Sequence, residues 1–261
     1  MKRLDSKFII GPHSRLFSVY SEPEGGLVRS SAVLLLYPGD QEYKMVHWAY
    51  RSLATHLAKA GWPVLRFDYT GTGDSAGETG TGNLDLWLKD AEVAADYLRL
   101  RSGCLHIQVV GVRLGVFVAA RLSRSRKLLN TVLWDAPVSG AGYLADLANL
   151  ESGQRAVDRF SKIARPASNT GFLDWTFGFP MPIWHKDMIG GLNWANEQVR
   201  STYCHSLITS GGAGGIHVLG SRCTTVDEAL GWGLSTKAQA ALLVPQCLKA
   251  IAGIIGRPQH D

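Results

Sequence analysis

The segment with the clearest chemical implication is Gly111-Val112-Arg113-Leu114-Gly115, which stands between a short apolar run and a helix-like segment. Its two glycines form the frame of a nucleophile elbow, G-x-S-x-G, in which a sharp strand-to-helix turn presents a serine hydroxyl at the head of a helix. Arginine occupies the serine position here. Because a guanidinium stays protonated and cannot attack a carbonyl, the sequence predicts an elbow without its nucleophile.

The charge of Arg113 leads to a second prediction. The head of a helix is already positive because its first backbone N–H groups are unpaired, so a guanidinium placed there needs a nearby anion. We expect Asp135 or Asp40 to supply it as a structural ion pair. The alternative is a carboxylate or phosphate group of a ligand, and both arrangements can coexist if one carboxylate leaves an edge of the guanidinium open.

The backbone around Arg113 is a further candidate binding feature. The N–H groups of Leu114 and of Gly39 or Asp40 are expected to form an oxyanion hole, which could still hold an anion. We therefore predict that any native ligand is anionic and binds between Gly39, Asp40, Arg113, Leu114 and Asp135, unless a protein side chain fills this position.

Other reactive side chains also have structural interpretations. Asp135 is either an acid on the elbow side of the sheet or a turn residue before Pro137. Ser75, in Gly73-Asp74-Ser75, is typical of a hydrogen bond within a tight turn. His185 and His205 lie in the region that could cover the site, and either remains a candidate acid or base.

Strands and helices alternate along the first half of the chain. Short apolar runs at 32–37, 63–67 and 106–110 are typical of parallel strands buried on both faces. Apolar residues recur at helical spacing over 45–59, over 84–100 and from 114 onward. This alternation predicts an α/β fold with a mostly parallel, doubly wound sheet. Residues 8–20 predict a leading antiparallel hairpin, and residues 139–170 a small cap insertion.

Residues 65–75, Leu-Arg-Phe-Asp-Tyr-Thr-Gly-Thr-Gly-Asp-Ser, together with the elbow frame and residues 133–138, resemble the α/β-hydrolase superfamily. More narrowly, they resemble serine-aminopeptidase-like proteins and the hydrolases associated with the exosortase A system, some of which also carry arginine in the elbow. The similarity covers residues 8–138. It implies the α/β-hydrolase fold, the position of the site and a bacterial protein, but a fold does not by itself supply a reaction.

In that fold an acid follows the nucleophile, and a histidine follows in the loop before the last helix. Residues 220–245 contain Asp227 and Glu228 but no histidine, and His260 lies near the end of the chain. We therefore expect a non-catalytic protein that binds an anionic or acyl-type small molecule, or a protein partner. The alternative is an enzyme with a non-standard mechanism, such as a lyase, a cyclase or an acyl-transfer enzyme, that uses Arg113 as an electrostatic clamp and Asp135 or a cap histidine as acid or base.

Composition sets the remaining expectations. A chain of 261 residues with 46% hydrophobic residues can bury one doubly wound sheet, so we expect a single domain. A homodimer is one of the expected partner arrangements. The net charge of +5 is scattered except over 121–127, where cations complement a helix C-terminus, so nucleic acid is not an expected partner. The cysteine and histidine spacings favour a cytoplasmic protein with neither metal nor cofactor. Pro245 interrupts the apolar stretch 238–256, which predicts a C-terminal helix and no membrane span.

Overall fold

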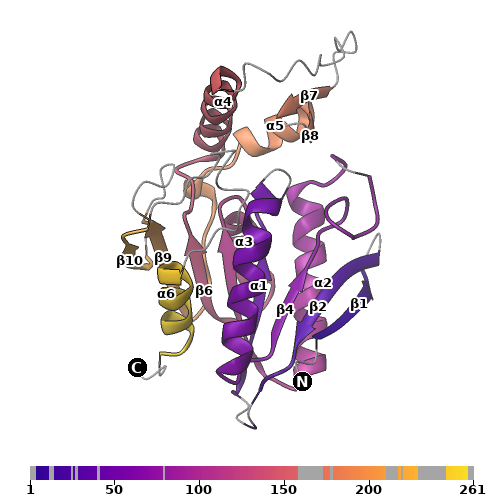
Figure 1. The fold of residues 1–261 in the computed structure, drawn as a ribbon, viewed down its shortest axis with the longest axis vertical. Helices are drawn as coiled ribbons and strands as arrows, with labels where there is room; N and C mark the ends of the chain where they lie inside the picture. Colours follow the sequence, from indigo (N-terminus) through magenta and orange to yellow (C-terminus); the bar gives the residue numbers. More distant parts are fainter. Residues whose placement is uncertain are drawn as a thin grey trace.

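The computed structural model describes residues 4–11, 15–24, 26, 29–39, 42–78, 80–157, 173–176, 179–209, 217–218, 220–228 and 245–257. Its centre is an eight-stranded sheet in the order β1-β2-β4-β3-β5-β6-β9-β10, with helices on both faces (Figure 1). The strands are β1 Leu4–Ile10, β2 Arg15–Ser21, β3 Ser31–Leu36, β4 Val64–Phe67, β5 His106–Val112, β6 Leu128–Trp134, β9 Tyr203–Thr209 and β10 Arg222–Val226.

Strand direction follows the predicted pattern. β1 and β2 form the antiparallel hairpin, β2 pairs antiparallel with β4, and the other neighbouring strands are parallel. Every residue of β3 and β4 is buried, as their continuous apolar runs require. The prediction was wrong in one respect, because β10 lies within the segment 220–245 that we expected to be a loop.

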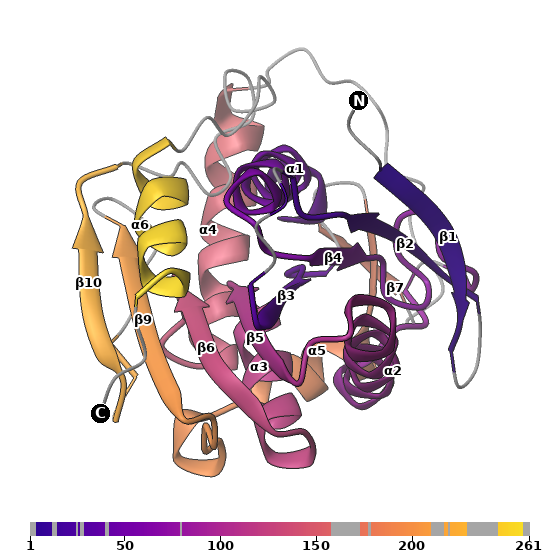
Figure 2. The same ribbon diagram turned by 90° about the horizontal axis from the view of Figure 1, so that it is seen from below.

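Four helices cover the central sheet. They are α1 Tyr43–Lys59, α2 Leu84–Ser102, α3 Gly115–Ser125 and α6 Pro245–Ile255. Figure 2 shows α1 and α6 on one face and α2 and α3 on the other, which is the doubly wound arrangement. Helix α2 has well-formed ends: the Asn83 side chain accepts a hydrogen bond from the backbone N–H of Leu86, and Gly103 ends the helix with a φ of 71°.

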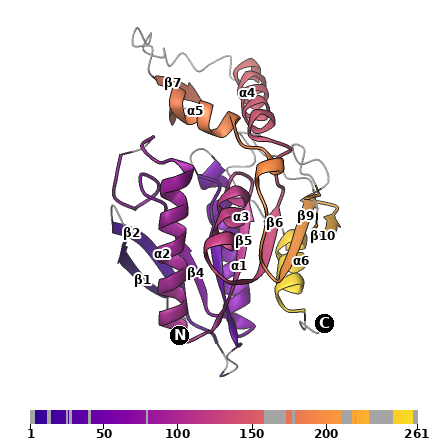
Figure 3. The same ribbon diagram turned by 180° about the vertical axis from the view of Figure 1, so that it is seen from behind.

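A second layer follows β6 and lies over the carboxyl end of the sheet (Figure 3). It comprises α4 Gly140–Val157, β7 Leu173–Thr176, β8 Phe179–Pro182, α5 Ile183–Gly190 and the short 3₁₀ helix Trp194–Asn196. Helix α4 falls in the range expected for the cap, of which 158–170 lie outside the described residues. β7, β8 and α5 extend the same layer beyond residue 170, and we call residues 140–196 the cap. No described helix is long and apolar enough to cross a membrane.

Candidate functional site

The predicted strand-to-helix turn is present between β5 and α3. Arg113 has a φ of 51°, in the left-handed region that is strained for residues other than glycine. A Cβ atom on Gly111 would lie 2.7 Å from the carbonyl oxygen of Gly115, and one on Gly115 would lie 2.5 Å from the carbonyl oxygen of Tyr37. Both elbow glycines are therefore required by close packing of backbone against backbone.

The Arg113 side chain is fully buried, with 0% exposure, and is held by residues from two elements. Its Nε donates to Glu42 Oε1 at 2.9 Å, and its Nη2 lies 3.9 Å from Asp146 Oδ2 of α4. The guanidinium carbon stands 5.2 Å from the centre of the Tyr143 ring, and the Tyr143 hydroxyl donates to Glu42 Oε2 at 3.0 Å. Glu42, at the start of α1, thus bridges the elbow and the cap.

These contacts keep the guanidinium charged. Burial acts to lower the pKa of Arg113, but Glu42, Tyr143 and Asp146 outweigh it and hold that pKa above its ordinary value. Burial raises the pKa of Asp146, although Arg113 acts in the opposite direction. The Arg113 side chain is therefore a cation at physiological pH.

Glu42 is an anion beside Arg113 that we did not predict. We expected Asp135 or Asp40, and the Asp40 alternative stays a prediction. The Asp135 carboxylate instead accepts hydrogen bonds from Thr209, from its backbone N–H at 2.9 Å and from its hydroxyl at 2.7 Å, and Asp40 lies outside the described residues. Glu42 was missed because no local pattern signals a pair separated by 71 residues.

Two of the residues proposed for the oxyanion hole, Leu114 and Gly39, are described, and Asp40 is not. Leu114 is the residue before α3, and Gly39 follows β3 with a φ of 82°. A Cβ on Gly39 would meet the Trp87 ring at 2.4 Å, so this loop rests directly on α2. No acceptor among the described residues bonds the backbone N–H of Leu114 or of Gly39. These donors remain the expected anion contacts.

The candidate histidines occupy different places. His185, in α5, is buried with its ring edge-on to Trp87, whose ring also packs against Gly39, and burial lowers the pKa of His185 to about 4. His205 lies in the amino-terminal half of β9, far along the strand from the elbow, and burial lowers its pKa as well. His260 lies outside the described residues.

Ser75 and the acidic residues near the last helix have structural roles. The Ser75 hydroxyl donates to the carbonyl oxygen of Asp68 at 2.6 Å and accepts from the backbone N–H of Phe17 at 2.8 Å, so it joins its loop to β2. Glu228 accepts from the backbone N–H of Cys247 at 2.8 Å, at the start of α6. In the part of the chain that the structure describes, no group of His, Cys, Asp or Glu side chains could hold a metal ion.

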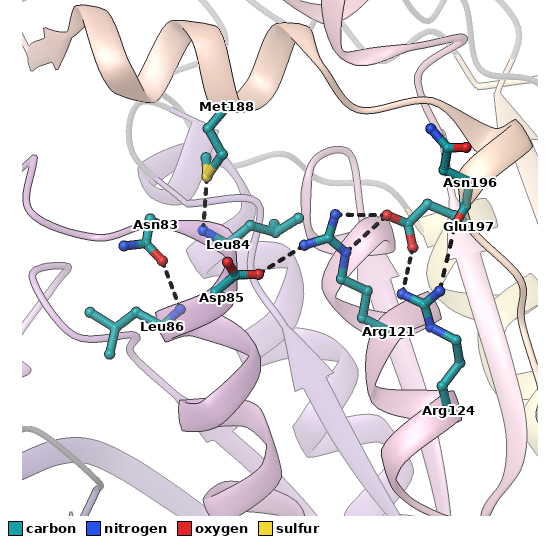
Figure 4. A network of polar contacts seen from close by, with 9 residues as sticks. All are labelled: Asn83, Leu84, Asp85, Leu86, Arg121, Arg124, Met188, Asn196 and Glu197. Carbon is teal, nitrogen blue, oxygen red and sulfur yellow. Dashed lines mark hydrogen bonds and ion pairs between the residues drawn. The ribbon is translucent and has the colours of Figure 1, made fainter.

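The cap is fastened to the body by a network on α2 and α3 (Figure 4). Glu197, which follows the cap, accepts from Arg121 Nε at 2.9 Å and from Arg124 Nη2 at 3.1 Å. The Met188 sulfur of α5 accepts from the backbone N–H of Leu84 at 3.1 Å. The basic run 121–127 therefore supplies cap contacts in addition to cations near the end of α3.

Comparison with known proteins agrees with this architecture. The family described as serine aminopeptidase, S33, matches residues 29–161, just over half of the chain. No curated protein matches. The structure is similar to Est1E from Butyrivibrio proteoclasticus, solved with ferulic acid bound, with a TM-score of 0.63 and 12% identity over 95% of this chain and 97% of that one.

Two further solved structures are similar. For the Pyrococcus furiosus esterase PF2001 the TM-score is 0.62, with 15% identity over 97% of this chain and 90% of that one. For XC6422 from Xanthomonas campestris, described as an α/β serine hydrolase without lid, the TM-score is 0.47, with 20% identity over 52% of this chain. That match spans 62% of XC6422, less than two thirds of its length. From the family match and the shared fold, the chain belongs to the serine aminopeptidase S33 family and has the α/β-hydrolase fold.

Proposed function

We propose that this chain is a non-catalytic member of its family and acts by binding. The observation that carries this proposal is the state of Arg113, which is buried at the elbow, ion-paired to Glu42 and covered by Tyr143. Acyl transfer by this fold needs a hydroxyl or thiol at that position and an imidazole to move its proton. Residues 227–259 contain no histidine.

We further propose that the ligand is a small molecule with a carboxylate, bound at the head of α3. Glu42 occupies the Nε side of Arg113 at 2.9 Å, whereas Asp146 stands 3.9 Å from Nη2 and keeps 33% of its side chain exposed. A ligand carboxylate would take the place of Asp146 when α4 moves, and the backbone N–H groups of Leu114 and Gly39 would add donors. Gly39, Asp40, Arg113, Leu114 and Asp135 would then surround the ligand.

Calorimetric titration with acetate and succinate tests the ligand. Asp146→Asn removes the internal competitor, so we expect it to bind carboxylate at least about fivefold more tightly than the natural protein, a change of about 1 kcal/mol. Asp187→Asn, a charge removal at an exposed site on α5, is the matched control and should bind like the natural protein. Equal affinities for all three proteins, or no binding by any, would contradict the carboxylate site.

Steady-state assays test the absence of catalysis independently. Hydrolysis of p-nitrophenyl esters and aminoacyl p-nitroanilides should be no faster with the natural protein than with Arg113→Met. Turnover that depends on Arg113 would instead support the enzyme with a non-standard mechanism.

A further inference from the structure

A second buried arginine lies outside the elbow and has no carboxylate partner among the described residues. Arg66, in β4, is 7% exposed, and its Nη1 donates to the Tyr37 hydroxyl at 3.2 Å. Its Nε is buried and has no hydrogen-bond partner, and none of the ion pairs among the described residues involves it. Removing a guanidinium from water without a neutralising partner is costly, so this charge calls for an anion.

Two more basic side chains lie on the neighbouring helix α1. His47 and Arg51 are one helical turn apart on α1, which packs on β4 and β2 (Figure 2). Arg66 lies opposite Val19 of β2 in the sheet register, so the side chains of Arg66 and Val19 are on the same face of the sheet. Tyr37 links two of these groups, because its hydroxyl accepts from Arg66 and its ring stacks on His47 with 6.3 Å between the ring centres. Burial lowers the pKa of His47, and the charges of Arg66 and Arg51 act in the same direction.

The neighbouring acidic groups are engaged elsewhere. Asp68 follows the last residue of β4. Its Oδ1 accepts a hydrogen bond from the Tyr43 hydroxyl at 2.8 Å, and its Oδ2 accepts one from the backbone N–H of Asp74 at 2.9 Å. Asp68 and Asp74 therefore act on the basic groups at longer range, without forming an ion pair with Arg66. The Nε of Arg66 is thus a buried donor without an acceptor among the described residues.

Aromatic rings hold the basic side chains in place. The Tyr37 ring, which accepts from Arg66 through its hydroxyl, stacks on His47 with an angle of 16° between the planes. The His47 ring is edge-on to Trp48, and the Arg51 guanidinium carbon lies 5.2 Å from the centre of the Trp48 ring. Side chains fixed in this way lose little freedom on binding, which favours a preorganised site.

We propose that Arg66, His47 and Arg51 form a phosphate-binding site on the flank of α1, for inorganic phosphate or a small molecule that carries a phosphate group. Two guanidinium groups and an imidazole match a group with two negative charges and three acceptor oxygens better than they match a carboxylate. Buried Arg66 would donate a charge-assisted hydrogen bond to the phosphate from the protein side. Exposed Arg51 would donate a second one from the solvent side of α1. This site is separate from the one proposed at Arg113.

Calorimetric titration of the full chain with inorganic phosphate tests the inference. We expect one phosphate per chain, and Arg51→Gln should weaken binding at least about fivefold, because one charge-assisted contact is lost. Lys59→Gln, which removes an exposed charge from the same helix, should stay within about twofold of the natural protein. Arg66→Met should abolish binding, and Arg51→Gln, at an exposed position, keeps the test decisive if Arg66→Met does not fold.

Three outcomes would overturn the site. The first is no phosphate binding by the natural protein, and the second is an equal effect of Arg51→Gln and Lys59→Gln. The third is tighter phosphate binding by Asp146→Asn with no effect of Arg51→Gln, which would place the anion at Arg113. That last result would support the proposed function while removing this inference.

Discussion

At the scale of single residues, the feature that defines this protein is a buried, ion-paired arginine at the turn between β5 and α3. The position at the head of α3 is built to present a side chain to a substrate, and Arg113 keeps the strained φ of 51° that this requires. Its guanidinium is instead turned into an internal network with Glu42 and Tyr143. The elbow thus serves here to hold a charge in place.

Restoring serine at the elbow should not restore catalysis. Arg113→Ser gives a hydroxyl without an imidazole positioned to take its proton, so hydrolysis of p-nitrophenyl acetate should remain at the level of Arg113→Ala. Robust turnover by the serine variant would show that a base exists near the elbow. His185 would then be the first candidate, and the double variant Arg113→Ser, His185→Phe should lose that activity.

The ion pair between Arg113 and Glu42 should behave as a buried pair in a double-mutant cycle. Glu42→Gln takes the hydrogen-bonded carboxylate away from a buried guanidinium and should cost about 3 kcal/mol or more of unfolding free energy, whereas adding Arg113→Met should recover much of that loss. Urea denaturation gives these values. The surface pair of Arg126 and Asp96, at 2.8 Å, is the control and should couple by no more than about 1 kcal/mol. Additive losses for Arg113 and Glu42 would contradict a structural ion pair.

At the scale of elements, the site depends on how the cap meets α1, α2 and α3. Tyr143 and Asp146 come from α4, His185 and Met188 from α5, and each reaches a group at the carboxyl end of the sheet. The cap therefore closes over Arg113 through polar contacts at α1 and α2. Its exit segment is tied to α3 by Glu197.

Glu197 should anchor the cap. Its side chain is 3% exposed and binds two arginines, so Glu197→Gln should lower the unfolding free energy by about 1–3 kcal/mol through loss of charge-assisted hydrogen bonds. Amide hydrogen exchange in α5 should also become faster. Asp85→Asn removes the exposed partner of the same Arg121 and should change stability by less than about 1 kcal/mol. Equal effects of the two substitutions would rule out an anchoring role.

The elements with strong periodicity could be predicted from sequence. Helices α1, α2 and α3 and strands β3, β4 and β5 were predicted because their apolar residues follow one clear period, and the elbow glycines fixed the turn between β5 and α3. Strands β9 and β10 were not predicted, since both mix polar with apolar residues. Glu42 could not be identified because its pairing depends on the packing of α1 against the elbow.

At the scale of the whole molecule, one buried sheet carries the site at its carboxyl edge, and the cap lies above it (Figure 1). In open α/β sheets this edge is where ligands bind, so the location of the site follows from the topology. Its chemistry does not. The sequence predicted where Arg113 would stand and that an anion would accompany it, but the anion's identity and the closure by Tyr143 and Asp146 required the folded chain.

The stability of the whole chain should fall in mild acid because of His185. Its pKa in the folded protein is about 4, below the ordinary value of 6.5, so the unfolded chain takes up a proton first as pH falls. The stability that neutral His185 provides is complete above about pH 6.5 and is lost between there and pH 4, by about 1–2 kcal/mol at pH 5.

Thermal unfolding at pH 7 and pH 5 checks this expectation. His185→Phe keeps a ring beside Trp87 and should show a smaller drop in Tm between the two pH values than the natural protein. His56→Phe, at an exposed position on α1, should show the natural drop. The same drop in all three proteins would mean that His185 does not carry the acid sensitivity.

The most direct test of the central claim is intact-mass spectrometry after incubation with a fluorophosphonate, a reagent that reacts with activated serine nucleophiles. Because a buried, ion-paired Arg113 stands where the nucleophile would be, we predict the unmodified mass of the chain, under conditions in which an active α/β-hydrolase is labelled completely. A single phosphonyl adduct, mapped by peptide analysis to one serine of this chain, would contradict the account.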